Sequence, residues 1–139
     1  MRSKVLVDTG PIVAMFSESD SHHRVCVEEL KKIDGPLLTC WPVLTEVACL
    51  LRAHLEAIRR LLSTFGGKPF QILQLHETEL ADISAILVKY KNLNIQLADA
   101  ALLYLANRES ISTVFTLDRR DFGTFRLSQG KTLRLIPKL

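Results

Sequence analysis

The chain has 139 residues, 47% of them hydrophobic and 24% charged, with a formal net charge of +3 at pH 7. This length is enough to bury one hydrophobic core but not two, so we expect a single domain over residues 1–139. The slightly basic balance permits a polyanionic partner without requiring one. No stretch approaches the roughly 18 consecutive apolar residues of a membrane span, so the composition argues against a membrane protein.

The cysteine content bears on the cellular compartment. Cys26, Cys40 and Cys49 are odd in number, lack a C-x-x-C spacing and fall in apolar segments. Such usage predicts reduced thiols in the core of a cytoplasmic protein. The apolar run near the N-terminus is interrupted by Asp8, so it does not match a signal peptide.

The first predicted element lies in residues 4–11, KVLVDTGP. Three apolar residues, two of them β-branched, predict a buried strand, and Gly10-Pro11 marks a turn after it. Asp8 therefore stands at the carboxyl end of a core strand, the edge at which open α/β sheets bind ligands. The alternative is that Asp8 caps the helix that follows.

Later segments alternate between helical and strand patterns. The predicted helices cover residues 11–16, 22–33, 41–51, 54–65, 77–90 and 96–108, and further strands cover residues 37–39, 70–75, 113–116 and 133–136. Strands separated by helices predict an α/β fold with a doubly wound, mostly parallel central sheet flanked by helices. Right-handed crossovers place the loops after strands at one edge of the sheet, so Asp8 and Asp118 should share that edge.

Two further acids occupy unfavourable places in the predicted helices. Glu46 lies in a helix that is apolar almost all round, and Asp99 stands beside the apolar stripe of another. An unpaired ionised carboxylate in such a place costs several kcal/mol, yet residues 43–51 and 93–105 contain no Lys or Arg. We therefore expect both acids to converge with Asp8 and Asp118 on a shared cation. A ligand set made only of carboxylates suits Mg²⁺ or Mn²⁺ and disfavours zinc, and such ions assist phosphoryl transfer.

Four segments occur in this order along the chain: VLVDTGPIVAMF, LTEVACLL, LADAALLYLA and TVFTLDRRDF. Over the whole chain they resemble a PIN domain, in particular the small VapC-type ribonuclease toxins of toxin–antitoxin pairs. The resemblance implies a three-layer PIN-like fold and a Mg²⁺- or Mn²⁺-dependent endoribonuclease. Its acidic quartet would be Asp8, Glu46, Asp99 and Asp118, with Asp8 and Asp99 holding the principal ion and Asp118 and Glu46 positioning a second ion or the attacking water.

Two accessory residues follow from the same resemblance. Thr9 matches the small hydroxyl residue that usually follows the first acid, where it would hold a metal-coordinated water or a phosphate. Asp121 is the second acid of a T-x-D-x-x-D-F segment, whose spacing differs from the commoner T-x-D-x-D-F form. We expect Asp121 to assist the quartet.

The resemblance also implies partners: an RNA substrate, an antitoxin that masks the active-site groove, and a second copy of the chain in a homodimer. Residues 25–33 and 41–65 are candidate contact surfaces because they carry more apolar side chains than one buried face needs.

Several other residues have both a functional and a structural interpretation. Arg119 and Arg120 flank the acids and are candidate RNA-binding residues, or else belong to a solvated loop or pair with Asp121. Trp41 is a candidate for stacking on a base, but beside Pro42 and a buried helix we expect it in the core. The histidines, His22, His23, His54 and His76, are expected in surface or capping roles.

Two other classes of function compete with the nuclease. A phosphoaspartyl phosphatase or receiver would use Asp8 as its nucleophile, but the phosphatase pattern needs an acid where Gly10 stands, and a receiver needs acids near residues 2–3. The other alternative is a PIN-fold protein-interaction module without nuclease activity. The presence of all four acids argues against it.

Overall fold

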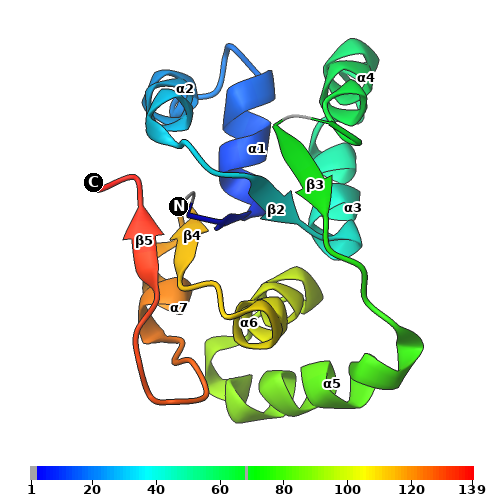
Figure 1. Ribbon diagram of the computed structural model, residues 1–139. Helices are drawn as coiled ribbons and strands as arrows, with labels where there is room; N and C mark the ends of the chain where they lie inside the picture. The colour runs from blue at the N-terminus through cyan, green and yellow to red at the C-terminus, as the bar shows by residue number, and fades with distance from the viewer. Residues whose placement is uncertain (1–2, 68) are drawn as a thin grey trace.

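The computed structural model describes residues 3–67 and 69–139, and its centre is one sheet of five strands in the order β3-β2-β1-β4-β5 (Figure 1). Each neighbouring pair of these strands runs parallel. The strands are β1 (Val5–Val7), β2 (Leu37–Thr39), β3 (Phe70–Ile72), β4 (Thr113–Phe115) and β5 (Arg134–Ile136). The α/β class and the parallel sheet are thus confirmed.

Helices cover both faces of the sheet (Figure 1). They are α1 (Thr9–Phe16), α2 (His23–Lys32), α3 (Trp41–Leu50), α4 (Leu55–Ser63), α5 (Leu80–Lys89), α6 (Leu97–Glu109) and α7 (Arg119–Thr124), with 3-10 turns η1 (Glu77–Glu79) and η2 (Lys91–Leu93). Helix α1 packs against α2, α3 and α4, and α6 packs against α5 and α3. The result is three layers, with α1 and α2 on one face and α5 and α6 on the other.

Most residues of the central elements are buried. All three residues of β1, β2 and β4 are buried, as expected for strands covered on both faces. Helix α6 buries seven of its thirteen residues, four of which are alanines. Small side chains let α6 approach α5 and α3 closely.

Element boundaries differ from the expectations at a few places. Strand β3 ends at Ile72 instead of residue 75, and the helix predicted over residues 77–90 begins as the 3-10 turn η1. The short helix α7 was not predicted, because six residues are too few for a helical periodicity to be visible.

Two expectations about burial were wrong. Trp41 is 57% exposed, because it is the first residue of α3, whose buried side consists of Val43, Leu44 and Val47. Cys49, on the same helix, is also exposed, whereas Cys26 and Cys40 are buried as expected. An apolar helix that lies at the margin of a layer still keeps one side in solvent.

The histidines take the surface and capping roles expected of them. His22, His54 and His76 are exposed at the starts of α2, α4 and η1, and the Nδ1 atom of His23 lies 2.7 Å from the carbonyl oxygen of Ala14. Within residues 3–67 and 69–139, no helix is long and apolar enough to cross a membrane.

The topology creates a crevice at one edge of the sheet. From β1 the chain builds outward through β2 to β3, and then returns to add β4 and β5 on the other side of β1. The loops after β1 and β4 therefore diverge at the switch point where α/β sheets bind ligands. Helices α3 and α6, which connect parallel strands, also begin at this edge.

Candidate active site

All the predicted acids line one open pocket of about 260 Å³ at the switch point. Its walls are Asp8, Thr9, Glu46, Asn94, Gln96, Asp99, Asp118 and Asp121. These residues come from the ends of β1 and β4, from the starts of α1, α6 and α7, from the second turn of α3 and from the position after η2. We call it the acidic pocket. The structure thus brings together the quartet expected from the sequence and both of its accessory residues.

Asp8 is the most buried of these acids, with 7% of its surface exposed. It occupies the N-cap position of α1, yet its side chain makes no capping hydrogen bond, so the capping alternative does not explain it. Burial raises its pKa from 3.8 to about 7, and the negative charges of Asp99 and Glu46 act in the same direction. A buried carboxylate facing other carboxylates is the arrangement that a bound cation relieves.

The hydroxyl of Thr116 holds Asp8 in place from the neighbouring strand. Thr116 Oγ1 donates a 2.8 Å hydrogen bond to Asp8 Oδ2 and accepts one of 2.9 Å from the backbone N–H of Asp118. Thr116 itself is fully buried just after β4. One hydroxyl therefore sets the positions of two of the four acids.

Glu46 is fixed by a side chain from the first turn of α1. Thr9 Oγ1 donates a 3.2 Å hydrogen bond to Glu46 Oε2. Glu46 lies in the second turn of α3, and the packing of α3 against both α1 and α6 brings it to the pocket. No basic side chain forms an ion pair with Glu46 among the described residues.

Asp99 stands in the first turn of α6, where the helix dipole favours a negative charge. Its Oδ2 accepts a 3.0 Å hydrogen bond from the backbone N–H of Gln96, the residue that caps the helix. Burial nevertheless raises the pKa of Asp99 to about 6, with Glu46, Asp118 and Asp121 adding like charge. The first turn of α6 thus presents a rigid carboxylate to the pocket.

Asp118 and Asp121 form a pair at the start of α7. Asp118 caps this helix, and its Oδ1 accepts a 2.9 Å hydrogen bond from the backbone N–H of Asp121. Burial raises the pKa of Asp121, and the charge of Asp118 adds to the effect. Asp121 therefore lines the same pocket as the four acids of the quartet.

The two arginines beside these acids differ in their environment. Arg120 is exposed, whereas Arg119 is half-buried, and its Nε and Nη2 atoms are buried with no hydrogen-bond partner in the described part of the chain. Within that part, neither arginine forms an ion pair with Asp121. The alternative interpretation, in which Arg119 or Arg120 forms an ion pair with Asp121, is thus wrong for the described part of the chain.

The donor chemistry of the acidic pocket fits a hard divalent cation. The ionisable side chains on its walls are all carboxylates, and Thr9, Asn94 and Gln96 add neutral oxygens. Within residues 3–67 and 69–139, no three His, Cys, Asp or Glu side chains are arranged to hold one ion directly. Mg²⁺ commonly uses one or two carboxylates and keeps several of its waters, so the pocket fits a partly hydrated ion better than a cage made only of protein atoms.

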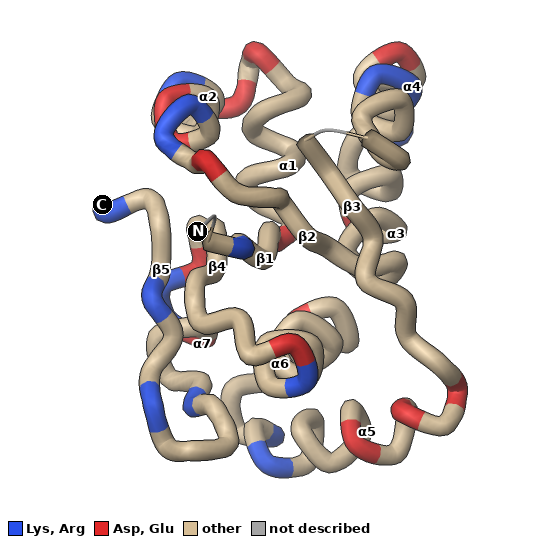
Figure 2. Tube along the Cα trace, viewed as in Figure 1, with Lys and Arg blue, Asp and Glu red and all other residues tan. Residues whose placement is uncertain are grey.

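Apart from Arg119 and Arg120, which are next to Asp118 in the sequence, much of the positive charge lies away from this pocket. Figure 2 shows Lys and Arg on the outer helices α2 and α4 and toward the C-terminal end of the chain, around β5. Among the described residues, no Lys or Arg lines the acidic pocket. An anionic substrate therefore needs a cation, or contacts that do not involve charge, to approach these acids.

Three residues of the site escaped the sequence interpretation: Asn94 and Gln96, which line the pocket, and the buried Thr116, which holds Asp8. A hydroxyl two residues before an acid, as in TLD, is a local signal for the contact between Thr116 and Asp118. A Gln three residues before Asp99 matches a capping pattern. The hydrogen bond between Thr116 and Asp8 has no local signal, because the two residues are 108 positions apart.

Comparisons with known proteins agree with this geometry. Ribonuclease VapC26 of Mycobacterium tuberculosis is 27% identical to the chain over 135 residues, which cover 96% of the chain and 100% of that protein. The solved structure of M. tuberculosis VapC20, a toxin that cleaves the sarcin–ricin loop, matches with a TM-score of 0.78 at 15% identity and covers 87% of this chain and 95% of that one. A toxin–antitoxin complex from Klebsiella pneumoniae matches with a TM-score of 0.67 at 18% identity and covers 87% and 92%.

The model of the PIN domain family matches residues 5–126, a span that begins at β1 and extends past α7. It thus includes every residue that lines the acidic pocket. The chain therefore belongs to the PIN domain family.

Proposed function

We propose that the protein is a metal-dependent endoribonuclease that hydrolyses RNA phosphodiester bonds as the toxin of a toxin–antitoxin pair. The observation that carries the proposal is the convergence of Asp8, Glu46, Asp99 and Asp118 on one pocket whose walls, among the described residues, carry no Lys or Arg. The likeness to a named ribonuclease over nearly the whole chain supports the activity. Likeness to structures of toxins and of a toxin–antitoxin complex supports the biological setting.

Each acid has a role in this proposal. Asp8 and Asp99 would hold the principal Mg²⁺ or Mn²⁺, because both are rigidly placed and because burial, with nearby like charges, raises the pKa of each. Asp118 and Glu46 would position a second ion or the attacking water. A bound divalent ion supplies charge neutralisation at the phosphate and lowers the pKa of water.

The protein's own residues prepare this chemistry by fixing the carboxylates before substrate arrives. Thr116 orients Asp8 and the backbone of Asp118, and Thr9 orients Glu46. Asp121, whose backbone N–H bonds to Asp118 and whose side chain lines the same pocket, would help to position the attacking water. Thr9 would also contact a substrate phosphate at the mouth of the pocket.

The partners belong to the same proposal. Arg119 and Arg120 would contact RNA phosphates outside the acidic pocket. An antitoxin would mask the pocket, and two copies of the chain would form a homodimer through exposed apolar residues such as Val25, Leu55 and Leu62 on α2 and α4. The protein would act in the cytoplasm, where RNA is available and an exposed thiol such as that of Cys49 stays reduced.

The experiment that tests the proposal is cleavage of total RNA by the purified protein. Mg²⁺ or Mn²⁺ should support cleavage and EDTA should abolish it, because the carboxylates alone repel the phosphodiester. The isosteric variant Asp8→Asn should be inactive under all these conditions. Cleavage that survives EDTA, or that Asp8→Asn retains in full, would disprove the assignment.

A further inference from the structure

A second pocket, of about 400 Å³, adjoins the acidic pocket. It is lined by Trp41, Pro42, Thr45, Glu46, Gln96, Leu97 and Ala98, and we call it the Trp41 pocket. Glu46 and Gln96 line both pockets, so the two share a wall. A ligand in the Trp41 pocket would therefore lie directly beside the acidic pocket.

Two large apolar side chains at this pocket are left in solvent. Trp41 is 57% exposed and Leu97 is 54% exposed, and each is the first residue of its helix, α3 and α6. Single exposed apolar residues are common on protein surfaces. Two that line one concave pocket beside a cluster of acids offer apolar area that a ligand can cover.

The electrostatics of the two pockets favour a ligand group without charge. In the described part of the chain neither pocket is lined by Lys or Arg, whereas the shared wall carries the carboxylate of Glu46. Phosphate contacts therefore cannot supply the affinity here. Stacking of a base on an aromatic ring needs no positive charge and is the usual alternative in proteins that bind single strands.

We propose that the Trp41 pocket binds one unpaired nucleobase of the RNA, the base of a nucleotide next to the phosphodiester that is cleaved. This inference rests on the ribonuclease function proposed above. Trp41 would supply the stacking face and Leu97 the opposite wall. The amide of Gln96 would face the edge of the base, where it can both donate and accept hydrogen bonds.

The shape of the surface favours a base over a protein partner. A stable protein interface buries about 800 Å² on each side, whereas the exposed face of α3 continues from Trp41 into the polar Thr45. Among the described residues, Trp41 and Leu97 are the two exposed large apolar residues that line the pocket, and the exposed Leu50 at the end of α3 does not line it. Its volume lies at the low end of the range of about 300–1,000 Å³ for small-molecule sites, which suits one nucleotide.

Cleavage kinetics on short single-stranded RNAs give the first test. Base stacking on an aromatic residue predicts that Trp41→Ala raises KM about 5- to 150-fold with little change in kcat, because the contact is made equally before and during the reaction. Trp41→Phe should restore most of the binding. Leu97→Ala should raise KM less, and Leu80→Ala is its matched control, since Leu80 is also the first residue of a helix and also 54% exposed.

Intrinsic fluorescence gives a direct test, because Trp41 is the only tryptophan of the chain. Asp8→Asn protein, which should not cleave and carries one negative charge fewer at the acidic pocket, is titrated with a tetranucleotide of each base and with an abasic oligomer of equal length. Base-containing oligomers should quench Trp41, and the abasic oligomer, which keeps the phosphates, should not. The four bases should also differ in affinity.

The outcomes separate this inference from the proposed function. If wild-type protein fails to cleave RNA in Mg²⁺ or Mn²⁺, the proposed function fails. If wild-type protein cleaves RNA while Trp41→Ala keeps the wild-type KM and base-containing oligomers do not quench fluorescence, the base pocket is disproved. If Trp41→Ala instead halves the mass measured by light scattering, the pocket contacts a second copy of the chain, and the base assignment is overturned.

Discussion

Thr116 Oγ1 donates a 2.8 Å hydrogen bond to Asp8 Oδ2, joining the ends of the two central strands at the acidic pocket. The same oxygen accepts from the backbone N–H of Asp118. Two carboxylates that face each other without a cation would otherwise move apart. This fully buried hydroxyl keeps them in register before a metal or substrate arrives.

We therefore expect Thr116→Val to lower kcat about 10- to 100-fold, the usual effect of removing a group that orients a metal ligand. The free energy of unfolding should fall by about 1–3 kcal/mol, because Asp8 Oδ2 and the backbone N–H of Asp118 each lose a hydrogen-bond partner. Cleavage rates and thermal melting of the purified variant provide the measurements.

Thr39→Val is the matched control for this change. Thr39 is also fully buried and its Oγ1 donates a 3.0 Å hydrogen bond to the carbonyl oxygen of Val7, but it does not line the acidic pocket. It should lose comparable stability and keep its kcat. Equal losses of kcat in the two variants would show that Thr116 acts only through stability.

Binding of a divalent ion should stabilise the protein measurably. For a ligand that binds only the folded state, a concentration of 100 times Kd adds about 2.7 kcal/mol, so Mn²⁺ should raise the Tm of the wild-type protein. Asp8→Asn should show little or no rise, because a principal ligand is lost. Without the ion its Tm should not be below that of the wild type, because a buried charge among like charges has been removed.

Asp34→Asn serves as the control for Mn²⁺ binding, because Asp34 is exposed and does not line the acidic pocket. Its melting temperature should rise with Mn²⁺ as the wild type's does. A rise of equal size in Asp8→Asn would remove Asp8 from the ligand set.

Replacement of Arg119 should have opposite effects on the free energy of unfolding and on RNA binding. Two of its guanidinium nitrogens are buried without a hydrogen-bond partner among the described residues, which costs about 1–3 kcal/mol for an unsatisfied group. Arg119→Met should therefore leave the free energy of unfolding unchanged or raise it, while weakening RNA binding if a phosphate is the missing partner. The two measurements are chemical denaturation and RNA titration of the inactive Asp8→Asn protein with and without the second change.

Arg120→Ala offers the comparison, because Arg120 is exposed and its removal should not alter stability by more than about 0.5 kcal/mol. It should weaken RNA binding through the loss of one charge. A large loss of stability in Arg119→Met would instead mean that this arginine is a structural residue.

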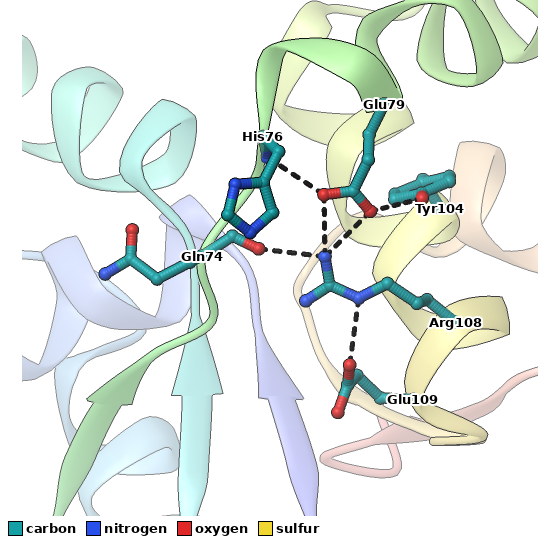
Figure 3. Close-up of polar contacts among 6 residues, drawn as sticks. All are labelled: Gln74, His76, Glu79, Tyr104, Arg108 and Glu109. Atoms are coloured by element: carbon teal, nitrogen blue, oxygen red, sulfur yellow. Dashed lines mark hydrogen bonds and ion pairs between the residues drawn. The ribbon is translucent and has the colours of Figure 1, made fainter.

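A network far from the acidic pocket should control stability in acid. Glu79 accepts hydrogen bonds from the hydroxyl of Tyr104, from the backbone N–H of His76 at 2.9 Å and from Arg108 Nη1 at 2.9 Å (Figure 3). Arg108 also donates to the carbonyl oxygen of Gln74. The network therefore joins the segment after β3 to the last turns of α6.

These contacts, chiefly the hydrogen bond from Tyr104, lower the pKa of Glu79 from 4.5 to about 2. An acid with a lowered pKa in the folded state stabilises that state fully above the unfolded value, and the contribution is lost as the pH falls. The wild-type Tm should therefore drop between pH 4.5 and 2, and Glu79→Gln should show a lower Tm at pH 7 with a smaller drop in that range. The exposed Glu77 of the same turn is the control, and Glu77→Gln should melt like the wild type at each pH.

Much of this architecture could be predicted from local patterns. The apolar run of β1 and the helical spacing of α2 and α6 indicate which sides of these elements are buried, because burial is the strongest constraint on sequence. The same dependence on local patterns explains why the prediction of a buried Trp41 is wrong. An apolar residue at the start of an apolar helix predicts burial, and nothing local shows that the helix begins at the rim of a pocket.

The sequence alone singled out the four acids that meet at the acidic pocket, because acids such as Glu46 and Asp99, in apolar segments without basic neighbours, are costly unless another group compensates their charge. Only the tertiary structure decided how those acids are held and what lies beside them. The hydrogen bond from Thr116 to Asp8 and the shared wall of the acidic and Trp41 pockets join residues far apart in the chain. Such contacts depend on the order of the strands and the packing of α3 against α6, which no local pattern encodes.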